Sequence, residues 1–125
     1  MSDALEYNND IAQSIADAER GVWDDETMTT DEAVRGFMDA CLDLQVTTVH
    51  SMHGSRFMDK ITLLRTVGDP DTRVTVDVRR PREVRVSTWW GGRSAFCTID
   101  APTLGSVMVE AAGYLMEADT IDGGF

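Results

Sequence analysis

The chain is poor in cationic side chains, and lysine is almost absent. Its 125 residues contain one lysine and ten arginines against 22 carboxylates, which gives a formal net charge of −11. A chain this acidic repels a polyanion, and that repulsion offsets the gain from releasing counterions of nucleic acid. The composition therefore favours a partner with a basic surface over direct binding to nucleic acid.

Several other features are missing. No apolar run approaches the roughly 20 residues that cross a bilayer, and the start, MSDALEYNND, lacks the basic and apolar regions of a secretion signal. The glycines show neither GxGxxG nor P-loop spacing. The two cysteines, Cys41 and Cys97, stand in apolar-periodic segments and are expected to be buried free thiols. We therefore expect a cytoplasmic protein with no membrane partner and no cofactor.

Apolar spacing predicts three helices. The first is predicted from a period near 3.6 residues at the start of the chain, formed by Ala4, Tyr7, Ile11, Ile15, Ala18 and Val22. A capping box at residues 29–32, Thr-Thr-Asp-Glu, predicts the start of a second helix after a loop at residues 23–30. The last and clearest helix covers residues 104–116, with Asp100 as its expected N-cap.

Alternating apolar residues between the second and third helices predict strands. Valines alternate at residues 74–78 and again at 84–86, while the segment from 46 to 68 has a less regular pattern. Gly91-Gly92 suits a two-residue hairpin, which would place residue 88 opposite 95, 86 opposite 97 and 84 opposite 99. Val84 and Val86 would then share a face with Ala95, Cys97 and Ile99.

Together these elements predict a single α+β domain over residues 1–125. Its sheet is a three- or four-stranded antiparallel meander, packed by two N-terminal helices and one C-terminal helix. Residues 1–3 and 118–125 are expected to fray.

Charge is distributed unevenly along the chain. Residues 1–55 contain twelve acidic and two basic side chains, which sum to −10. Residues 56–93 contain five acidic and nine basic side chains, which sum to +4. Residues 94–125 contain five acidic side chains and no basic one, which sum to −5. The helical parts are therefore acidic and the strands are locally basic.

The acidic residues around the second helix form the first candidate binding site. Spaced carboxylates can imitate the phosphates of nucleic acid, because long-range attraction depends on where charge is placed. The alternative is a solvated helix face that only keeps the protein soluble. Trp89 or, alternatively, Trp23 would supply an apolar anchor. The candidate residues are Asp24, Asp25, Glu26, Asp31, Glu32, Asp39, Asp43 and Trp89.

The basic, aromatic segment around residues 77–92, DVRRPREVRVSTWWGG, offers a second candidate site. Aromatic rings among arginines on a sheet face could stack bases and hold phosphates, or anchor a protein partner. Alternatively, a helix covers the aromatic rings and the arginines pair with nearby acids. An exposed face would also suit sheet-to-sheet dimerisation. The residues of this face are Arg73, Arg79, Arg85, Trp89 and Phe96.

His50 and His53 are the only histidines, three residues apart. A metal site needs a third or fourth ligand, and Cys41 or Asp59 would have to supply it. A small enzyme or metal-binding protein built on this pair is the third alternative, and no catalytic residue is predicted.

The leading hypothesis is a non-enzymatic protein that binds another macromolecule. More narrowly, it is a small acidic inhibitor of a nucleic-acid-handling protein: a phage or mobile-element anti-defence protein of the anti-CRISPR or DNA-mimic type, or a nuclease immunity protein. The expected partner is a protein with a basic nucleic-acid-binding surface.

Overall fold

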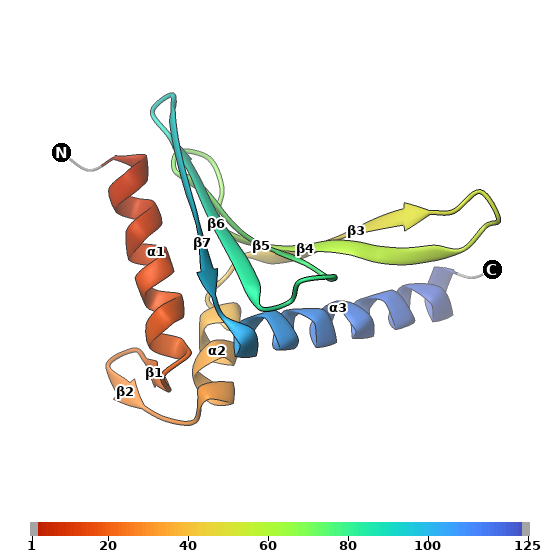
Figure 1. Cartoon of the computed structure of the whole chain (residues 1–125), viewed down its shortest axis with the longest axis horizontal. Coiled ribbons are helices and arrows are strands. Elements are labelled where there is room, and N and C mark those ends of the chain that lie inside the picture. The colour runs from red at the N-terminus through yellow and green to blue at the C-terminus, as the bar shows by residue number, and fades with distance from the viewer. Residues whose placement is uncertain (1–2, 124–125) are drawn as a thin grey trace.

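The computed structural model describes residues 3–123 and contains three helices, a five-stranded antiparallel sheet and a two-stranded sheet (Figure 1). The α+β class predicted from the sequence is confirmed. In chain order, the elements are α1 (Ala4–Ala18), β1 (Val22–Trp23), β2 (Glu26–Thr27), α2 (Thr30–Asp39), β3 (Asp43–His50), β4 (Arg56–Thr66), β5 (Asp71–Asp77), β6 (Glu83–Trp90), β7 (Arg93–Asp100) and α3 (Pro102–Gly123).

The large sheet has one strand more than the highest number predicted. Its strands lie side by side in sequence order from β3 to β7, and every neighbouring pair is antiparallel. The irregular pattern at residues 46–68 has a structural cause, because the register shifts between Thr47 and Thr48 and again between Leu64 and Thr66. Each bulge inserts an extra residue and so breaks the alternation from which strands are predicted.

The predicted register of the last hairpin is confirmed. Val84 pairs with Ile99, Val86 with Cys97 and Thr88 with Ala95, and Trp90 and Arg93 flank the glycine turn. Gly91 and Gly92 have φ values of 60° and 77°, which a two-residue hairpin turn requires.

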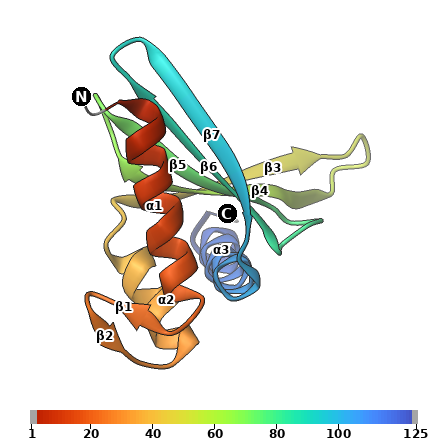
Figure 2. The same ribbon diagram turned by 60° about the vertical axis from the view of Figure 1, so that its left-hand side comes forward.

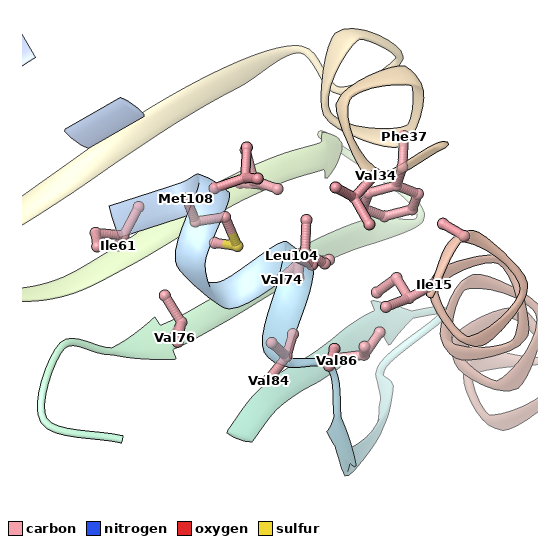
Figure 3. Packing of buried hydrophobic residues seen from close by; sticks show 14 of the residues in the cluster. Ile15, Val34, Phe37, Ile61, Val74, Val76, Val84, Val86, Leu104 and Met108 are labelled. Carbon is pink, nitrogen blue, oxygen red and sulfur yellow. The ribbon is translucent and has the colours of Figure 1, made fainter. Parts of the chain in front are cut away.

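The hydrophobic core lies between the three helices and one face of the large sheet, which we call the inner face (Figures 2 and 3). Ile15 of α1, Phe37 of α2 and Met108 of α3 pack in the same cluster as Val74 and Val86 of the sheet. All three helices therefore cover the same face. On the opposite face, which we call the outer face, the described part of the chain places no helix.

Two helix ends differ in how well the sequence predicted them. The predicted start of α2 is confirmed with Thr29 as its N-cap, since Thr29 Oγ1 accepts a hydrogen bond from the backbone N–H of Glu32. The Glu32 carboxylate accepts a hydrogen bond from the Thr29 hydroxyl. The predicted N-cap of α3 is wrong, because Asp100 ends β7 and pairs with Arg82. The carboxylate of Glu19, which follows α1, instead accepts the backbone N–H groups of Thr103 (3.2 Å) and Leu104 (2.7 Å).

The first helix is shorter than predicted, because α1 ends at Ala18 and Val22, the last residue of the predicted apolar stripe, lies in β1 after Gly21, whose φ is 79°. The predicted loop before α2 contains a small hairpin, in which Val22 pairs with Thr27 and Trp23 with Glu26. At the other end of the chain, the backbone of α3 continues to Gly123. The segments expected to fray extend beyond the described residues at both ends. No helix in the described part of the chain is long and apolar enough to cross a membrane.

Candidate protein-binding surfaces

The β1–β2 hairpin presents the first acidic group. Its turn consists of Asp24 and Asp25, whose φ values are 52° and 61°. Positive φ at both central residues is the geometry that two-residue hairpins favour, and aspartate tolerates it better than most residues. Asp24, Asp25 and Glu26 are all exposed. The hairpin therefore holds three consecutive carboxylates in solvent in a defined conformation.

Packing against α2 fixes the position of this hairpin. The ring of Trp23 lies edge-on to Phe37, with centroids 6.0 Å apart and an interplanar angle of 86°. Gly36 makes the contact possible, because a Cβ there would lie 2.6 Å from Cδ1 of Trp23. The backbone N–H of Met28 also donates to the carbonyl of Gly21 (2.8 Å), which closes the hairpin at its base.

Helix α2 carries the remaining predicted acidic residues at its two ends. Asp31 and Glu32 are in its first turn, whereas Asp39 ends the helix and Asp43 begins β3. Ten helical residues span about 15 Å, so the predicted residues form two groups rather than one cluster. Together with the hairpin carboxylates, these residues form what we call the acidic end: Asp24, Asp25, Glu26, Asp31, Glu32, Asp39 and Asp43.

Most of this charge is not neutralised within the molecule. Among the described residues, Asp31 is the single member of the acidic end that forms an ion pair. Its partner Arg35 lies 2.8 Å away through Nε and also contacts Glu110 at 3.5 Å. The other six carboxylates remain available to an external cation.

Trp89 does not belong to the acidic end. It is the penultimate residue of β6, next to the turn that leads into β7. Figures 1 and 2 both place that turn at the far end of the sheet from the β1–β2 hairpin. The sequence contains no information on this distance, because the tertiary fold sets it.

The outer face brings together four of the five residues predicted for a sheet-face site. Arg73 of β5, Ser87 of β6 and Phe96 of β7 lie opposite one another across the three strands. Trp89 is the next residue of β6 after Ser87 that points to the outer face. Arg85 lies between Thr75 and Thr98. Arg79 is different, because it follows β5 in the turn that leads into β6.

Aromatic rings on this face are exposed and stack with arginines. Trp89 is 48% exposed and Phe96 is 64% exposed, so no helix covers them. The guanidinium of Arg85 lies 4.1 Å from the centroid of the Phe96 ring, and that of Arg73 lies 5.9 Å from the Trp89 ring. Both distances are within the range of cation–π attraction.

Acidic neighbours neutralise most of the arginines around this face. Arg79 contacts Asp77 and Asp59 at 2.9 Å each, and Arg82 contacts Asp100 at 3.2 Å. Hydrogen bonding from Arg79 lowers the pKa of Asp77 to about 2, so that carboxylate is ionised throughout the physiological range. These ion pairs therefore neutralise part of the positive charge that the sequence places between residues 56 and 93.

The histidines and cysteines are the residues of the third predicted alternative. His50 ends β3, and both His50 and His53 are exposed. Among the side chains that the structure describes, no group of three histidine, cysteine, aspartate or glutamate residues could hold a metal ion. Cys41 is partly buried, its Sγ lies 3.4 Å from the carbonyl of Phe37, and burial raises the pKa of its thiol.

Comparison of the chain with protein-family models, with curated proteins and with solved structures finds no match in any of the three.

Sequence reasoning missed the hairpin that holds Asp24 and Asp25. The signal was present but short: two turn-forming residues between Val22-Trp23 and Glu26-Thr27. Strands of two residues are too short for alternation to reveal. Their pairing depends on Trp23 packing against α2, which local sequence does not show.

Proposed function

We propose that this protein is a non-enzymatic inhibitor that binds, through its acidic end, the basic nucleic-acid-binding surface of another protein. The observation that carries the proposal is that six of the seven carboxylates of the acidic end form no ion pair among the described residues, while four arginines in and next to the sheet, Arg73, Arg79, Arg80 and Arg82, each contact a carboxylate. A partner that normally holds phosphates would meet carboxylates in their place. An anti-defence protein of the DNA-mimic type and a nuclease immunity protein both fit this description.

Electrostatic attraction gives this binding mode a distinct physical signature. Complementary charges steer association and raise the association rate at low salt. Exposed charges are screened over about 8 Å at physiological ionic strength, so the rate falls as salt is added. The folded hairpin limits the ordering entropy that Asp24 and Asp25 would otherwise lose on binding.

The test is a pull-down from the organism that encodes the protein, with a charge-neutralised variant. The variant Asp24→Asn/Asp25→Asn/Glu26→Gln removes three charges, and asparagine adopts the positive φ of the turn readily. The control Glu6→Gln/Asp10→Asn/Glu117→Gln removes three charges from exposed positions on α1 and α3.

We expect the wild type and the control to capture the same nucleic-acid-handling protein at low salt. The amount that the hairpin variant captures should be at least tenfold lower. Circular dichroism should show all three proteins folded. Capture of no protein of this class, or equal capture by the hairpin variant, would contradict the proposal.

The open outer face supports a second candidate function, a nucleic-acid-binding module. Trp89 and Phe96 could stack bases while Arg73 and Arg85 contact phosphates. The intramolecular pairing of Arg73 with Asp71 and the net charge of −11 weigh against it. Fluorescence anisotropy with a labelled single-stranded oligonucleotide tests it: binding that Arg85→Ala and Trp89→Ala abolish would favour this second function over the first.

A further inference from the structure

The outer face contains a concave site at the end where β5 turns into β6. The cavity has a volume of about 620 Å³, within the range of small-molecule pockets. The strands contribute its floor and the turn contributes its wall. We call it the anion pocket, and its lining residues are Lys60, Thr75, Asp77, Arg79, Arg80, Glu83, Arg85 and Thr98.

The charge of this pocket differs in sign from the charge of the molecule. Four cations line it, against Asp77, Glu83 and the adjacent Asp59, which gives a local sum of +1 in a protein of −11. The wall is internally paired: Arg79 contacts Asp77 and Asp59, and Arg80 lies 3.8 Å from Glu83. Lys60 and Arg85 form no ion pair with any described residue. The surplus positive charge therefore belongs to these two side chains.

Arg85 is already held in an orientation that suits an anion. Its guanidinium lies over the ring of Phe96, 4.1 Å from the centroid. A stacked guanidinium keeps its N–H donors in the plane of the group, where they can form the paired hydrogen bonds that carboxylates and phosphates accept. The structure gives those donors no hydrogen-bond partner among the described residues. The stack thus reduces the ordering cost of binding.

Neighbouring hydroxyl groups add donors to the same site. Thr75 and Thr98 are the cross-strand neighbours of Arg85 on β5 and β7, and all three line the pocket. Lys60 approaches from β4, where its register partner is Asp77 of β5. A fork of guanidinium donors, an ammonium group and two hydroxyls is a donor set that oxyanions bind.

We propose that the anion pocket binds the phosphate or carboxylate group of a small ligand, with Arg85 and Lys60 as its principal contacts. The exposed ring of Phe96 beside Arg85 favours a ligand whose anionic group is attached to a planar apolar part. This site is separate from the acidic end, so either proposal can fail without the other.

The experiment is an NMR titration of the full chain with four probes: inorganic phosphate, phenyl phosphate, benzoate and a ten-residue oligothymidylate. We expect saturable shifts of the Thr75 and Thr98 amides and of the Arg85 side-chain N–H with phenyl phosphate or benzoate. The first three probes distinguish a phosphate from a carboxylate ligand, and the oligonucleotide tests a nucleic-acid backbone as the source of phosphate.

Variants then distinguish binding at specific side chains from non-specific electrostatic attraction. Arg85→Gln and Lys60→Gln should each raise the dissociation constant at least tenfold, and Phe96→Leu should raise it severalfold. Arg82→Gln removes the same charge at the same end of the sheet, outside the pocket, and should change it less than twofold. No saturable shift, equal weakening by Arg82→Gln, or binding of the oligonucleotide alone would overturn the proposal.

Discussion

At the scale of single residues, the absence of a side chain at Gly105 allows the β5–β6 turn to pack against α3. A Cβ at this position would overlap the carbonyl oxygen of Pro81. We expect Gly105→Ala to lower the free energy of unfolding by about 1–3 kcal/mol, because the helix or the turn must move. Urea denaturation of both proteins measures the difference.

Gly113 provides the matched control in the same helix. No heavy atom lies within 4 Å of the position its Cβ would take. Alanine is the better helix former, so Gly113→Ala should raise the free energy of unfolding by about 0.5–1 kcal/mol. Equal effects at the two positions would contradict the packing described for Gly105.

A buried polar chain links α1 to the sheet. Thr88 Oγ1 donates to Asn8 Oδ1 at 2.9 Å and lies 3.0 Å from Thr72 Oγ1, and all three residues are fully buried. The change Thr88→Val leaves the Asn8 oxygen without this partner, so stability should fall by about 1–3 kcal/mol. In Thr62→Val, which removes the partly exposed Thr62–Thr75 contact, the loss should stay below about 0.5 kcal/mol. Thermal or urea unfolding measures the stability of both variants. Similar losses of stability would show that the buried hydrogen bonds contribute no more than the partly exposed one.

At the scale of elements, the start of α3 depends on a residue that follows α1. Glu19 accepts two backbone N–H groups of α3, which makes it a remote counterpart of an N-cap side chain. We expect Glu19→Ala to lower the free energy of unfolding by about 1 kcal/mol. Glu117→Ala, at an exposed position of α3, should change it by less than about 0.5 kcal/mol. Denaturant unfolding tests both, and an unchanged midpoint for Glu19→Ala would show that the contact contributes nothing.

The turn between β5 and β6 should respond to pH. The pKa of Asp77 is about 2, chiefly because Arg79 donates hydrogen bonds to it, whereas an unfolded aspartate titrates near 3.9. A lowered folded-state pKa means that the stabilisation is fully present above about pH 4 and is lost as pH falls toward 2. In Arg79→Gln, carbon-detected NMR should find the Asp77 pKa raised toward 3.9. Arg82→Gln should leave it unchanged, and a low pKa persisting in Arg79→Gln would refute the assigned cause.

Elements with a long regular pattern were the ones that the sequence could predict. The stripe from Leu104 to Met108 and beyond predicts α3, and the two-residue glycine turn fixes the β6–β7 register. The hairpin at residues 22–27, the bulges in β3–β4 and the Glu19 cap were missed. Each depends on contacts between residues far apart in the chain, which periodicity does not detect.

The same limit applies to the candidate surfaces. The sequence placed acidic residues around α2, and the structure agrees. It also placed arginines in the strands, but Arg79, Arg80 and Arg82 lie in the turn between β5 and β6. It could not show that Arg79 and Arg82 are paired with carboxylates. Nor could it show that Trp89 lies on the outer face and not beside the acidic end.

At the scale of the whole molecule, the fold separates two kinds of surface. The helices and the β1–β2 hairpin form an electronegative side with few internal counter-charges, while the outer face mixes paired arginines with exposed aromatic rings. A net charge of −11 gives long-range repulsion between copies of the protein and long-range attraction toward cations. The proposed binding through the acidic end is based on this arrangement.

Association kinetics with the captured partner test this most directly. Biolayer interferometry should show the wild-type association rate falling at least tenfold between 50 and 500 mM salt, on the order of magnitude expected for electrostatic steering. At 50 mM salt, the variant Asp24→Asn/Asp25→Asn/Glu26→Gln should associate severalfold more slowly than the control that loses three charges from Glu6, Asp10 and Glu117. Association that is independent of salt, or equal for the two variants, would contradict the account.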